Sequence, residues 1–285
     1  MVGSRSSPVE RVREALRASG ASGIASSIPS GFQRVGDVVL LRLPESLRPE
    51  FGRIGRAYQT ALGVATVARH RGPTGGERRL PDLEVIAGES TITEVLEHGV
   101  RYRFDAARVL FSRGNEIERA RAGRLTRPGE TVVDLFAGIG YFVLPALVVG
   151  GAGRAYAVEE NPESHRYLVE NLLRNHVADR ATVLLGDNRS VAIPVRGADR
   201  VFLGYLPSSL PWIPLALGLV RPGGSLHAHL VVDAHGDRER GETAVRGAVE
   251  AAGGFVETAS ARRVKAYGPG RSHVVVDATV TPRAG

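Results

Sequence analysis

Residues 132–140 read Val-Val-Asp-Leu-Phe-Ala-Gly-Ile-Gly, an apolar strand that ends at Asp134 and leads through a glycine turn into a helix-compatible run. A second acidic residue, Glu159, follows Gly140 by nineteen positions. Glycines let the backbone approach a ligand closely, and an acidic side chain about 20 residues later can accept hydrogen bonds from ribose hydroxyls. The pattern predicts a nucleoside-binding site in an α/β sheet, although such a turn can also need glycine for backbone geometry alone.

The spacing of the turn narrows the kind of nucleoside. Val143 stands where the dinucleotide fingerprint Gly-x-Gly-x-x-Gly expects its third glycine, which disfavours a pyrophosphate at the helix N-terminus. A cofactor without phosphates fits better. The segment Asp-Leu-Phe-Ala-Gly-Ile-Gly resembles motif I of the class I S-adenosylmethionine (SAM)-dependent transferases, whose cofactor is a nucleoside that carries an amino acid on a sulfonium.

Composition indicates an intracellular enzyme. The 285 residues can form one large α/β domain and a smaller one, and the 43% hydrophobic content is ordinary for a globular protein. The sequence holds no cysteine, which excludes disulfides and thiolate zinc sites, and no apolar run long enough to span a bilayer. The first residues lack the apolar core of a secretion signal. We therefore expect a cytoplasmic protein with no membrane contact.

The positive charge is concentrated in the N-terminal part. Residues 1–130 carry 21 Arg and 15 Asp plus Glu, whereas residues 131–285 carry 16 Lys plus Arg and 15 Asp plus Glu. A basic part beside a nearly neutral one favours a polyanionic partner such as RNA. The alternative is a compositional bias, because Lys265 is the only lysine and arginine is the default cation throughout.

The N-terminal part divides into two segments. Residues 1–30 read as a basic, partly disordered tail or a marginal helix. Residues 31–105 predict a small α+β domain, the candidate contact surface for RNA. We expect its strands at 37–43, 64–68, 83–87 and 100–104 and a helical stretch through Tyr58 to Leu62. A loop between two of these strands carries four arginines that suit phosphate contacts or, alternatively, a solvated turn: Arg69, Arg71, Arg78 and Arg79.

Residues 106–285 alternate between strands and helices. Strands at 131–135, 154–158, 181–185, 199–204 and 224–231 predict a parallel sheet with right-handed crossovers. Asn161 as a cap, Pro162 at the first helical position and Glu163 in the first turn mark the helix after the second strand. Strand-like runs at 263–267 and 274–280 predict a terminal hairpin that adds an antiparallel strand, as in the class I methyltransferase-like, Rossmann-like fold.

Acidic residues end three of these strands. Ligands of open α/β sheets bind outside the carboxyl ends of the strands, so Asp134, Glu159 and Asp187 are candidate contacts. Glu159 can accept from ribose hydroxyls, and Asp187 with Asn188 can read the adenine edge. The structural alternatives are a helix-dipole role for Glu159 and an Asx turn for Asp187.

Six blocks of sequence together resemble one family of tRNA-modifying enzymes. They are Phe-Ser-Arg-Gly-Asn-Glu-Ile-Glu-Arg at 111–119, the Asp-Leu-Phe-Ala-Gly-Ile-Gly-Tyr block, Glu-Glu-Asn-Pro at 159–162, Gly-Asp-Asn-Arg at 186–189, Asp-Arg-Val-Phe-Leu-Gly-Tyr at 199–205 and Tyr-Gly-Pro-Gly-Arg-Ser-His at 267–273. The family contains the tRNA guanine-37 N1-methyltransferases and the wybutosine-pathway aminocarboxypropyltransferases. The resemblance covers residues 31–281.

The resemblance implies a set of cofactor contacts. Counterparts of Ser112, Arg119, Glu159, Asp187 and Asn188 contact SAM in that family, and we add three residues around the glycine turn: Asp134, Phe136 and Gly138. Arg119 is then placed to pair with the methionine carboxylate. Its alternative role is a surface ion pair with Glu116.

One departure from the family pattern separates two activities. The methyltransferases carry an Asn-x-Pro type motif at the end of the fourth strand, whereas this strand ends Gly204-Tyr205-Leu206-Pro207. The pair Gly204 and Tyr205 resembles the aminocarboxypropyltransferase branch. We therefore expect transfer of the 3-amino-3-carboxypropyl group of SAM to the wyosine precursor 4-demethylwyosine at position 37 of tRNA-Phe, with release of methylthioadenosine. The alternatives are methyl transfer to guanine 37 and, less well supported, a non-catalytic RNA-binding module.

The catalytic group itself is not indicated by the sequence. Positioning of the reacting carbon supplies most of the catalysis in such a reaction, and we expect Arg119, Gly204 and Tyr205 to contribute to it. Tyr205 and Phe136 can stack on adenine or the target base, or be core aromatics. His227, His229, Asp233 and His235 have metal-ligand character, but we expect polar lining and no metal. The expected partner is the tRNA-Phe anticodon loop, bound by a monomer.

Overall fold

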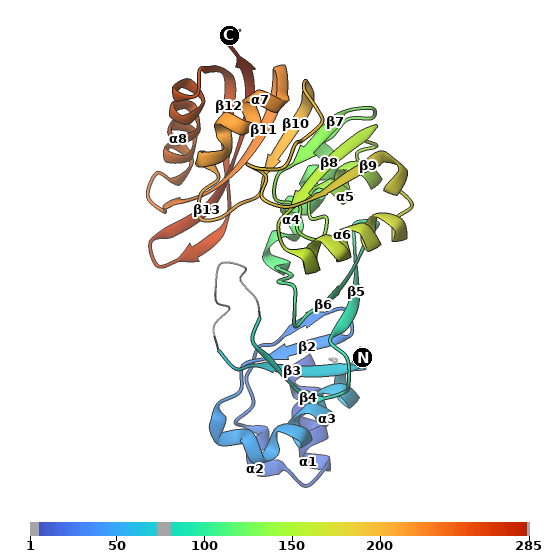
Figure 1. Cartoon of the computed structure of the whole chain (residues 1–285). Helices are drawn as coiled ribbons and strands as arrows, with labels where there is room; N and C mark the ends of the chain where they lie inside the picture. The colour runs from blue at the N-terminus through green and yellow to red at the C-terminus, as the bar shows by residue number, and fades with distance from the viewer. Residues whose placement is uncertain (1–5, 73–80, 284–285) are drawn as a thin grey trace, which may run out of the picture. The chain divides into compact units, whose positions relative to one another are not determined.

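The structure, a computed structural model that describes residues 6–72 and 81–283, divides into two compact units (Figure 1). Unit 1 consists of Met1–Leu96 and Arg103–Phe111, and unit 2 of Glu97–Tyr102 and Ser112–Gly285. The chain passes between the units three times, because β5 (Ile92–Glu97) and β6 (Val100–Asp105) pair in a two-stranded sheet whose turn belongs to unit 2. The division therefore differs from a single boundary after residue 105.

Unit 1 begins with a helix that contributes to its core. Ser7 caps α1 (Pro8–Ala18) by accepting a hydrogen bond from the backbone N–H of Glu10, and Pro8 takes the first helical position. Val12 and Leu16 of this helix are fully buried in one cluster with Ile54 and Tyr58 of the helix α3 (Phe51–Leu62). Of the two alternatives for residues 1–30, the described part from residue 6 onward is therefore a packed helix and not a disordered tail.

The rest of unit 1 is a four-stranded sheet with order β1-β2-β3-β4, in which β2 and β3 run parallel and the other pairs antiparallel. Its elements are β1 (Gln33–Val35), β2 (Val38–Leu41), β3 (Thr66–His70), β4 (Leu83–Ala87), α2 (Ser22–Ala25), η1 (Glu45–Glu50) and α3 (Phe51–Leu62). The predicted α+β character is present. The short strand β1 and the strand β5 gave no clear signal in the sequence, because β1 is three residues long and β5 mixes polar and apolar residues on both faces.

Unit 2 contains a seven-stranded sheet with order β12-β13-β11-β10-β7-β8-β9 (Figure 1). Its strands are β7 (Thr131–Asp134), β8 (Arg154–Glu159), β9 (Ala181–Leu185), β10 (Ala198–Leu203), β11 (Val220–Asp233), β12 (Gly254–Gly268) and β13 (Arg271–Pro282). The pairs from β11 through β10, β7 and β8 to β9 are parallel, and β13 is antiparallel to both β11 and β12. The predicted parallel sheet with a terminal antiparallel hairpin is confirmed.

Helices pack against this sheet and bury its apolar residues. They are α4 (Glu116–Leu125), α5 (Val143–Val148), α6 (Pro162–Arg174), α7 (Ile213–Leu219) and α8 (Asp237–Ala251), with the short turns η2 (Arg113–Asn115), η3 (Ala178–Arg180) and η4 (Leu210–Trp212). Helix α8 contacts β11, β12 and β13, whereas α5 and α6 contact the strands β7 to β9. The Asn161 side chain accepts from the N–H of Glu163, so α6 has the predicted cap. Over the described ranges, no helix is both long and apolar enough to cross a membrane.

Candidate functional site

The glycine turn after β7 depends on two backbone conformations that favour glycine. Gly138 has φ +56° and Gly140 has φ +105°, which L-residues with a side chain rarely adopt. A Cβ on Gly138 would lie 2.5 Å from the ring of Tyr141, and one on Gly140 would lie 2.5 Å from Leu144. Both glycines are therefore required by the local structure, and the turn they form brings backbone N–H groups to the end of β7.

Asp134 closes β7 with a fully buried carboxyl group. Its Oδ1 accepts a hydrogen bond of 3.1 Å from the backbone N–H of Phe136, and Oδ2 has no hydrogen-bond partner among the described residues. Burial raises the pKa of Asp134 to about 7, because little solvent remains to stabilise the charge. A buried acceptor with an unused oxygen is the kind of group that a hydrogen-bond donor of a ligand can satisfy.

Glu159 lies at the carboxyl end of the neighbouring strand β8 and links it to the glycine turn. Its Oε2 accepts from the N–H of Gly138 at 2.7 Å, and its Oε1 accepts from the N–H of Asn161 at 2.8 Å. Burial raises its pKa as well, against the lowering effect of these hydrogen bonds. A carboxylate has about four lone-pair sites, so two backbone donors leave acceptor capacity for ribose hydroxyls.

Asp187, after β9, has a different environment from the two buried carboxyl groups. Its carboxylate is bound by the guanidinium of Arg189, with distances of 3.0 Å and 2.7 Å to Nε and Nη2, and it also accepts from the backbone N–H of Arg189. These hydrogen bonds lower the pKa of Asp187 to about 2. The carboxylate therefore stays ionised and can accept from an exocyclic amino group such as that of adenine.

Asn188 is buried, and its amide is held from both sides. Nδ2 donates to the carbonyl of Leu135 at 2.7 Å, and Oδ1 accepts from Trp212 Nε1 at 2.8 Å. Because both ends of the amide already bond within the protein, Asn188 fixes the turn after β9 against the end of β7. Its role toward adenine stays a prediction.

Trp212 is a residue that sequence analysis missed. Its ring contacts Phe136 and Tyr205 with centroid distances of 5.0 Å and 4.9 Å, and those two rings lie 5.0 Å apart. The three aromatic side chains thus form one cluster beside Asn188, and Tyr205 is 40% exposed. Trp212 is the only tryptophan of the chain. Its rarity was the signal in the sequence that could have marked it as a candidate site residue.

Arg119 contacts Ser112, another of the candidate cofactor contacts, and its guanidinium is paired with a carboxylate that the sequence did not indicate, that of Glu97. Its Nε and Nη2 donate to the two carboxylate oxygens of Glu97 at 2.7 Å and 2.9 Å, and Nη1 donates to the carbonyl of Ser112 at 2.9 Å. Both charged side chains are almost fully buried. The planar fork of Arg119 is therefore engaged by Glu97, and neither the surface pair with Glu116 nor a free guanidinium describes it.

The end of β10 carries the departure from the methyltransferase pattern. A Cβ on Gly204 would lie 2.6 Å from the ring of Phe142. The phenylalanine ring thus favours glycine at position 204. The next position, 205, is the one that an Asn-x-Pro motif ending at Pro207 would fill with asparagine, and here it is Tyr205.

Comparisons with known proteins agree with this geometry. The family model described as the TRM5/TYW2 methyltransferase domain matches residues 93–252, and the model described as the TYW2 N-terminal domain matches residues 12–91. The chain belongs to the TRM5/TYW2 family. The second match covers the α1 helix that sequence analysis could not separate from a tail.

The similarity to members of the TRM5/TYW2 family extends over most of the chain. The chain is 39% identical over 272 residues to a Pyrococcus horikoshii protein named tRNA(Phe) (4-demethylwyosine(37)-C(7)) aminocarboxypropyltransferase. The aligned residues cover 95% of this chain and 96% of that protein. The mouse tRNA wybutosine-synthesizing protein 2 homolog is 38% identical over 219 residues, and the chain spans 48% of its length.

Solved structures of family members superpose on the chain. The crystal structure of P. horikoshii TYW2 in complex with MeSAdo has a TM-score of 0.84 and 34% identity, and it covers 96% of this chain and 100% of that one. The M. jannaschii tRNA m1G37 methyltransferase has a TM-score of 0.75 at 26% identity, with 95% and 79% of the two chains covered. The class I methyltransferase-like fold of the family is thereby confirmed.

The predicted RNA-contacting arginines divide into three groups. Arg69 is 5% exposed, pairs with Glu84 and Glu45 at 2.7 Å and 3.0 Å, and lies over the ring of Phe51. Its charge is neutralised inside unit 1, so we leave it out of the proposed phosphate contacts. Arg71 is exposed and pairs with Asp82. Arg78 and Arg79 lie outside the described residues.

His227 belongs to a closed network between β11, β10 and β13. Arg200 Nη1 lies 2.6 Å from His227 Nε2, and because arginine can only donate, that nitrogen is the acceptor. His227 Nδ1 therefore carries the proton and donates to Asp277 Oδ1 at 2.5 Å. Burial lowers the pKa of His227 well below its usual value, which keeps the ring neutral.

His229 forms a second buried pair, with its Nδ1 3.0 Å from Nε2 of His273. Burial lowers the pKa of both, that of His273 to about 4. Within the described ranges, no group of three or more His, Cys, Asp or Glu side chains is placed to hold a metal ion. The two histidine positions on β11 thus serve hydrogen bonding within the sheet.

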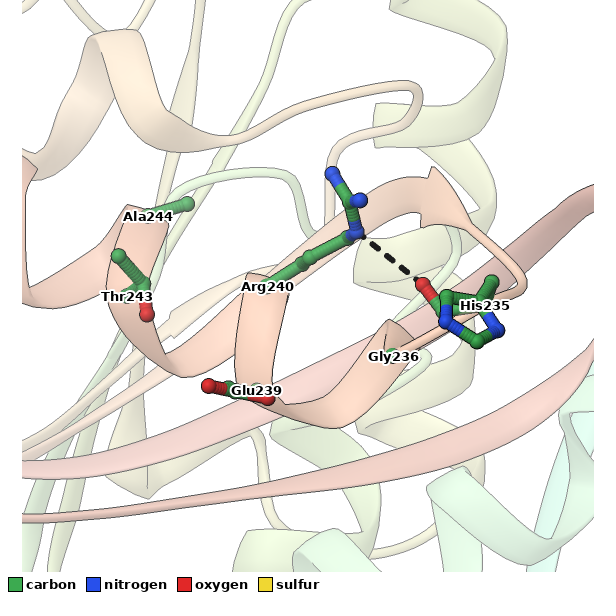
Figure 2. A pocket seen from close by; sticks show the side chains of 6 residues that line it. All are labelled: His235, Gly236, Glu239, Arg240, Thr243 and Ala244. Carbon is green, nitrogen blue, oxygen red and sulfur yellow. Dashed lines mark hydrogen bonds between the residues drawn. The ribbon is translucent and has the colours of Figure 1, made fainter.

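His235, the last residue of the predicted histidine set, lines a shallow pocket at the start of α8. Figure 2 shows its six lining residues, with the guanidinium of Arg240 turned toward the backbone of His235, and Arg240 Nε donates to that carbonyl at 3.1 Å. The remaining lining residues are Gly236, Glu239, Thr243 and Ala244. The pocket is lined by an exposed acidic side chain, Glu239, and an exposed basic one, Arg240, so its charge favours no particular ligand.

Proposed function

We propose that this chain transfers the 3-amino-3-carboxypropyl group of SAM to 4-demethylwyosine at position 37 of tRNA-Phe and releases methylthioadenosine. The observation that carries the proposal is the agreement with the P. horikoshii aminocarboxypropyltransferase over nearly the full length of both proteins, N-terminal domain included. Tyr205 supports the same branch of the family, because it stands where an Asn-x-Pro motif ending at Pro207 has its asparagine.

The residues at the sheet edge fit SAM. The cofactor presents hydrogen-bond donors at its ribose, its amino group and its adenine, and it bears a positive sulfonium. The site presents carboxyl groups: Asp134 with an unpartnered buried oxygen, Glu159 with remaining acceptor capacity, and Asp187 held ionised. Ribose recognition by Glu159, adenine recognition by Asp187, and further contacts by Ser112, Asn188, Phe136 and the Gly138 turn form the proposed set.

The reaction requires the protein to align the reacting carbon of SAM with the target base and to exclude water. When bound, SAM supplies an electrophilic carbon next to a sulfonium, and the pair of electrons of the broken carbon–sulfur bond stays on sulfur to give the neutral thioether. Which carbon reacts follows from which one the protein aligns with the target base. The aromatic cluster of Phe136, Tyr205 and Trp212 offers apolar faces for adenine or the base, with Tyr205 at the exposed end.

Membership of the TRM5/TYW2 family indicates a tRNA as the partner. An aTrm5 structure in complex with tRNALeu has a TM-score of 0.74 to this chain at 26% identity. The anticodon loop as the contacted region, the cytoplasm as location and a monomeric state stay predictions. Among the predicted arginines, we retain Arg71, Arg78 and Arg79 as phosphate contacts.

Product analysis tests the proposal. The chain is incubated with SAM and either tRNA-Phe carrying the wyosine precursor or unmodified transcript, and the RNA and the small molecules are analysed by mass spectrometry. We expect methylthioadenosine together with an RNA heavier by one aminocarboxypropyl group, with the precursor tRNA only. Adenosylhomocysteine with an RNA heavier by one methyl group would establish the methyltransferase activity instead. RNA binding without either product would show that the chain acts as a non-catalytic RNA-binding module.

A further inference from the structure

Lys265 is chemically exceptional in this chain. It is one lysine among 37 basic residues of which all others are arginine, and it lies on β12 with its side chain half-buried. Lysine provides a compact ammonium with three donors, whereas arginine provides a broad planar fork. A lysine at a single position therefore indicates a place where size matters as well as charge.

The structure shows where the ammonium lies. Lys265 Nζ donates to Ser112 Oγ at 3.0 Å, across 153 positions of sequence. A Cβ on Gly114 would lie 3.2 Å from both Cδ and Nζ of Lys265, so the lysine lies closely along the turn η2 that follows Ser112. Ser112, Gly114 and Lys265 all belong to unit 2.

Ser112 is held on its other side by Arg119. The guanidinium donates to the Ser112 carbonyl while its fork binds Glu97, and the Arg119 side chain lies 5.9 Å from the ring centroid of Tyr141, next to the glycine turn. The ion pair neutralises Arg119, so a carboxylate of a ligand would have to compete with Glu97 for it. Lys265 places a second positive charge against the same serine.

Lys265 lies opposite His273 in the pairing of β12 with β13. Burial and the positive charges of Lys265 and Arg262 lower the pKa of His273 to about 4, which keeps that histidine neutral. The ammonium of Lys265 donates directly to Ser112 Oγ. A carboxylate that bonded to Ser112 Oγ would thus meet Lys265 Nζ as well.

We propose that Lys265, together with Ser112 Oγ, recognises the carboxylate of the aminocarboxypropyl arm of SAM, and that Arg119 acts as a positioning residue that holds Ser112 through the Glu97 ion pair. The inference rests on the proposed function, since it concerns the group that is transferred. Binding of the carboxylate holds one end of the aminocarboxypropyl arm in place, and aligned transfer of that arm requires this.

Binding measurements isolate the carboxylate. Calorimetry compares SAM, decarboxylated SAM and methylthioadenosine as ligands of the parent protein and of Lys265→Met, with Arg263→Met on the same strand as the charge-matched control. We expect Lys265→Met to lose affinity for SAM about tenfold or more, because a charge-assisted hydrogen bond is lost, and to keep its affinity for the other two ligands. Arg263→Met should bind all three as the parent does.

The outcomes separate the two proposals. Equal losses for all three ligands, or no loss for SAM, would overturn the role of Lys265 while the product analysis still decides the reaction. A parent protein that binds neither SAM nor methylthioadenosine would overturn the proposed function itself. Retained methylthioadenosine binding also shows that the variant is folded.

A second measurement needs no variant. Because Lys265 is the only lysine, an amine-reactive acetylating reagent can modify one side chain and the α-amino group, and mass spectrometry of the peptide reports the rate at each. We expect SAM to slow acetylation of Lys265 strongly, and decarboxylated SAM or methylthioadenosine to leave it near the rate of the free protein. Equal rates with and without SAM would contradict the proposal.

Discussion

The two ends of the sheet of unit 2 hold their polar side chains in different ways. At the parallel end, the carboxyl groups of Asp134 and Glu159 bond mainly to backbone N–H groups of the turns that follow the strands. Toward the antiparallel end, His227 of β11 binds Asp277 of β13 on one side and Arg200 of the parallel strand β10 on the other.

This difference separates binding from stability. A carboxyl group held by backbone amides is fixed in place and keeps lone pairs for the donors of a ligand. A network of side chains that satisfy one another has its capacity used internally, and it contributes order to the sheet. Substitution of Glu159 should therefore change ligand affinity, and substitution within the network around His227 should change the free energy of unfolding.

The largest effect is expected from Arg200→Met, which opens the network around His227. Arg200 is buried and donates to Glu130, to the Leu125 carbonyl and to His227, all of which lose a partner in the variant. We expect the free energy of unfolding to fall by about 3–5 kcal/mol, as for other broken buried ion pairs. Urea unfolding followed by the fluorescence of Trp212 measures it.

The control for Arg200→Met is Arg221→Met, which removes an exposed arginine that pairs with Asp199 on the same strand as Arg200. It should leave the urea midpoint near that of the parent, because solvent screens an exposed pair. If Arg200→Met unfolds at the same urea concentration as the parent, the network does not stabilise the sheet.

At the parallel end, Glu159→Ala should weaken SAM binding by about 1–3 kcal/mol, since the ribose hydroxyls lose a charged acceptor. Glu160→Ala is the matched control, because Glu160 follows directly in sequence and its side chain is exposed. Calorimetry with SAM compares both with the parent. Unchanged affinity of the Glu159 variant would remove the ribose assignment, and an equal loss in both variants would make the effect one of general charge.

The pH dependence of stability should have opposite signs at the two ends. The pKa of His273 is about 4 in the folded chain and about 6.5 when unfolded, so its contribution is present above the unfolded value and is lost as the pH falls toward 4. The loss reaches at most about 1.4 kcal/mol per pH unit. Asp134, with its pKa raised to about 7, contributes fully below its unfolded value of 3.8 and loses that contribution as the pH rises to 7.

Two variants separate these contributions. His273→Gln should make the decline of stability on acidification shallower, whereas Asp134→Asn should make it steeper, because the opposing carboxyl contribution is gone. Urea unfolding at about pH 7 and about pH 5 gives the two slopes. Slopes that match the parent in both variants would show that neither group titrates as its burial requires.

The smallest effect is expected from Arg189→Met, which opens the exposed pair with Asp187. The pKa of Asp187 should rise from about 2 toward its ordinary range, because the guanidinium hydrogen bonds that lower it are lost. The urea midpoint should stay at that of the parent. Carboxyl NMR titration follows the pKa, and a value still near 2 would mean that the backbone N–H alone controls it.

Local signals in the sequence determined much of unit 2. The glycine turn, the cap of α6 and the final hairpin are each encoded within a few residues, because positive φ angles, capping hydrogen bonds and alternating strand faces are short-range properties. They located Asp134, Glu159 and Asp187 at the strand ends, where the structure has them. The strands β1 and β5 gave no clear signal, and α1 was predicted only as an alternative to a disordered tail, because the burial of its Val12 and Leu16 depends on the rest of unit 1.

Partnerships between distant residues were decided by the tertiary structure. Arg119 binds Glu97, Trp212 holds Asn188, and Lys265 reaches Ser112, although nothing local to any of these residues specifies the partner. The physical reason is that such contacts depend on which strands become neighbours and how the connecting turns pack. The sequence shows which hydrogen-bonding and charged groups a side chain has. The order of the strands decides which of these groups are used by partners inside the protein and which can still bind a ligand.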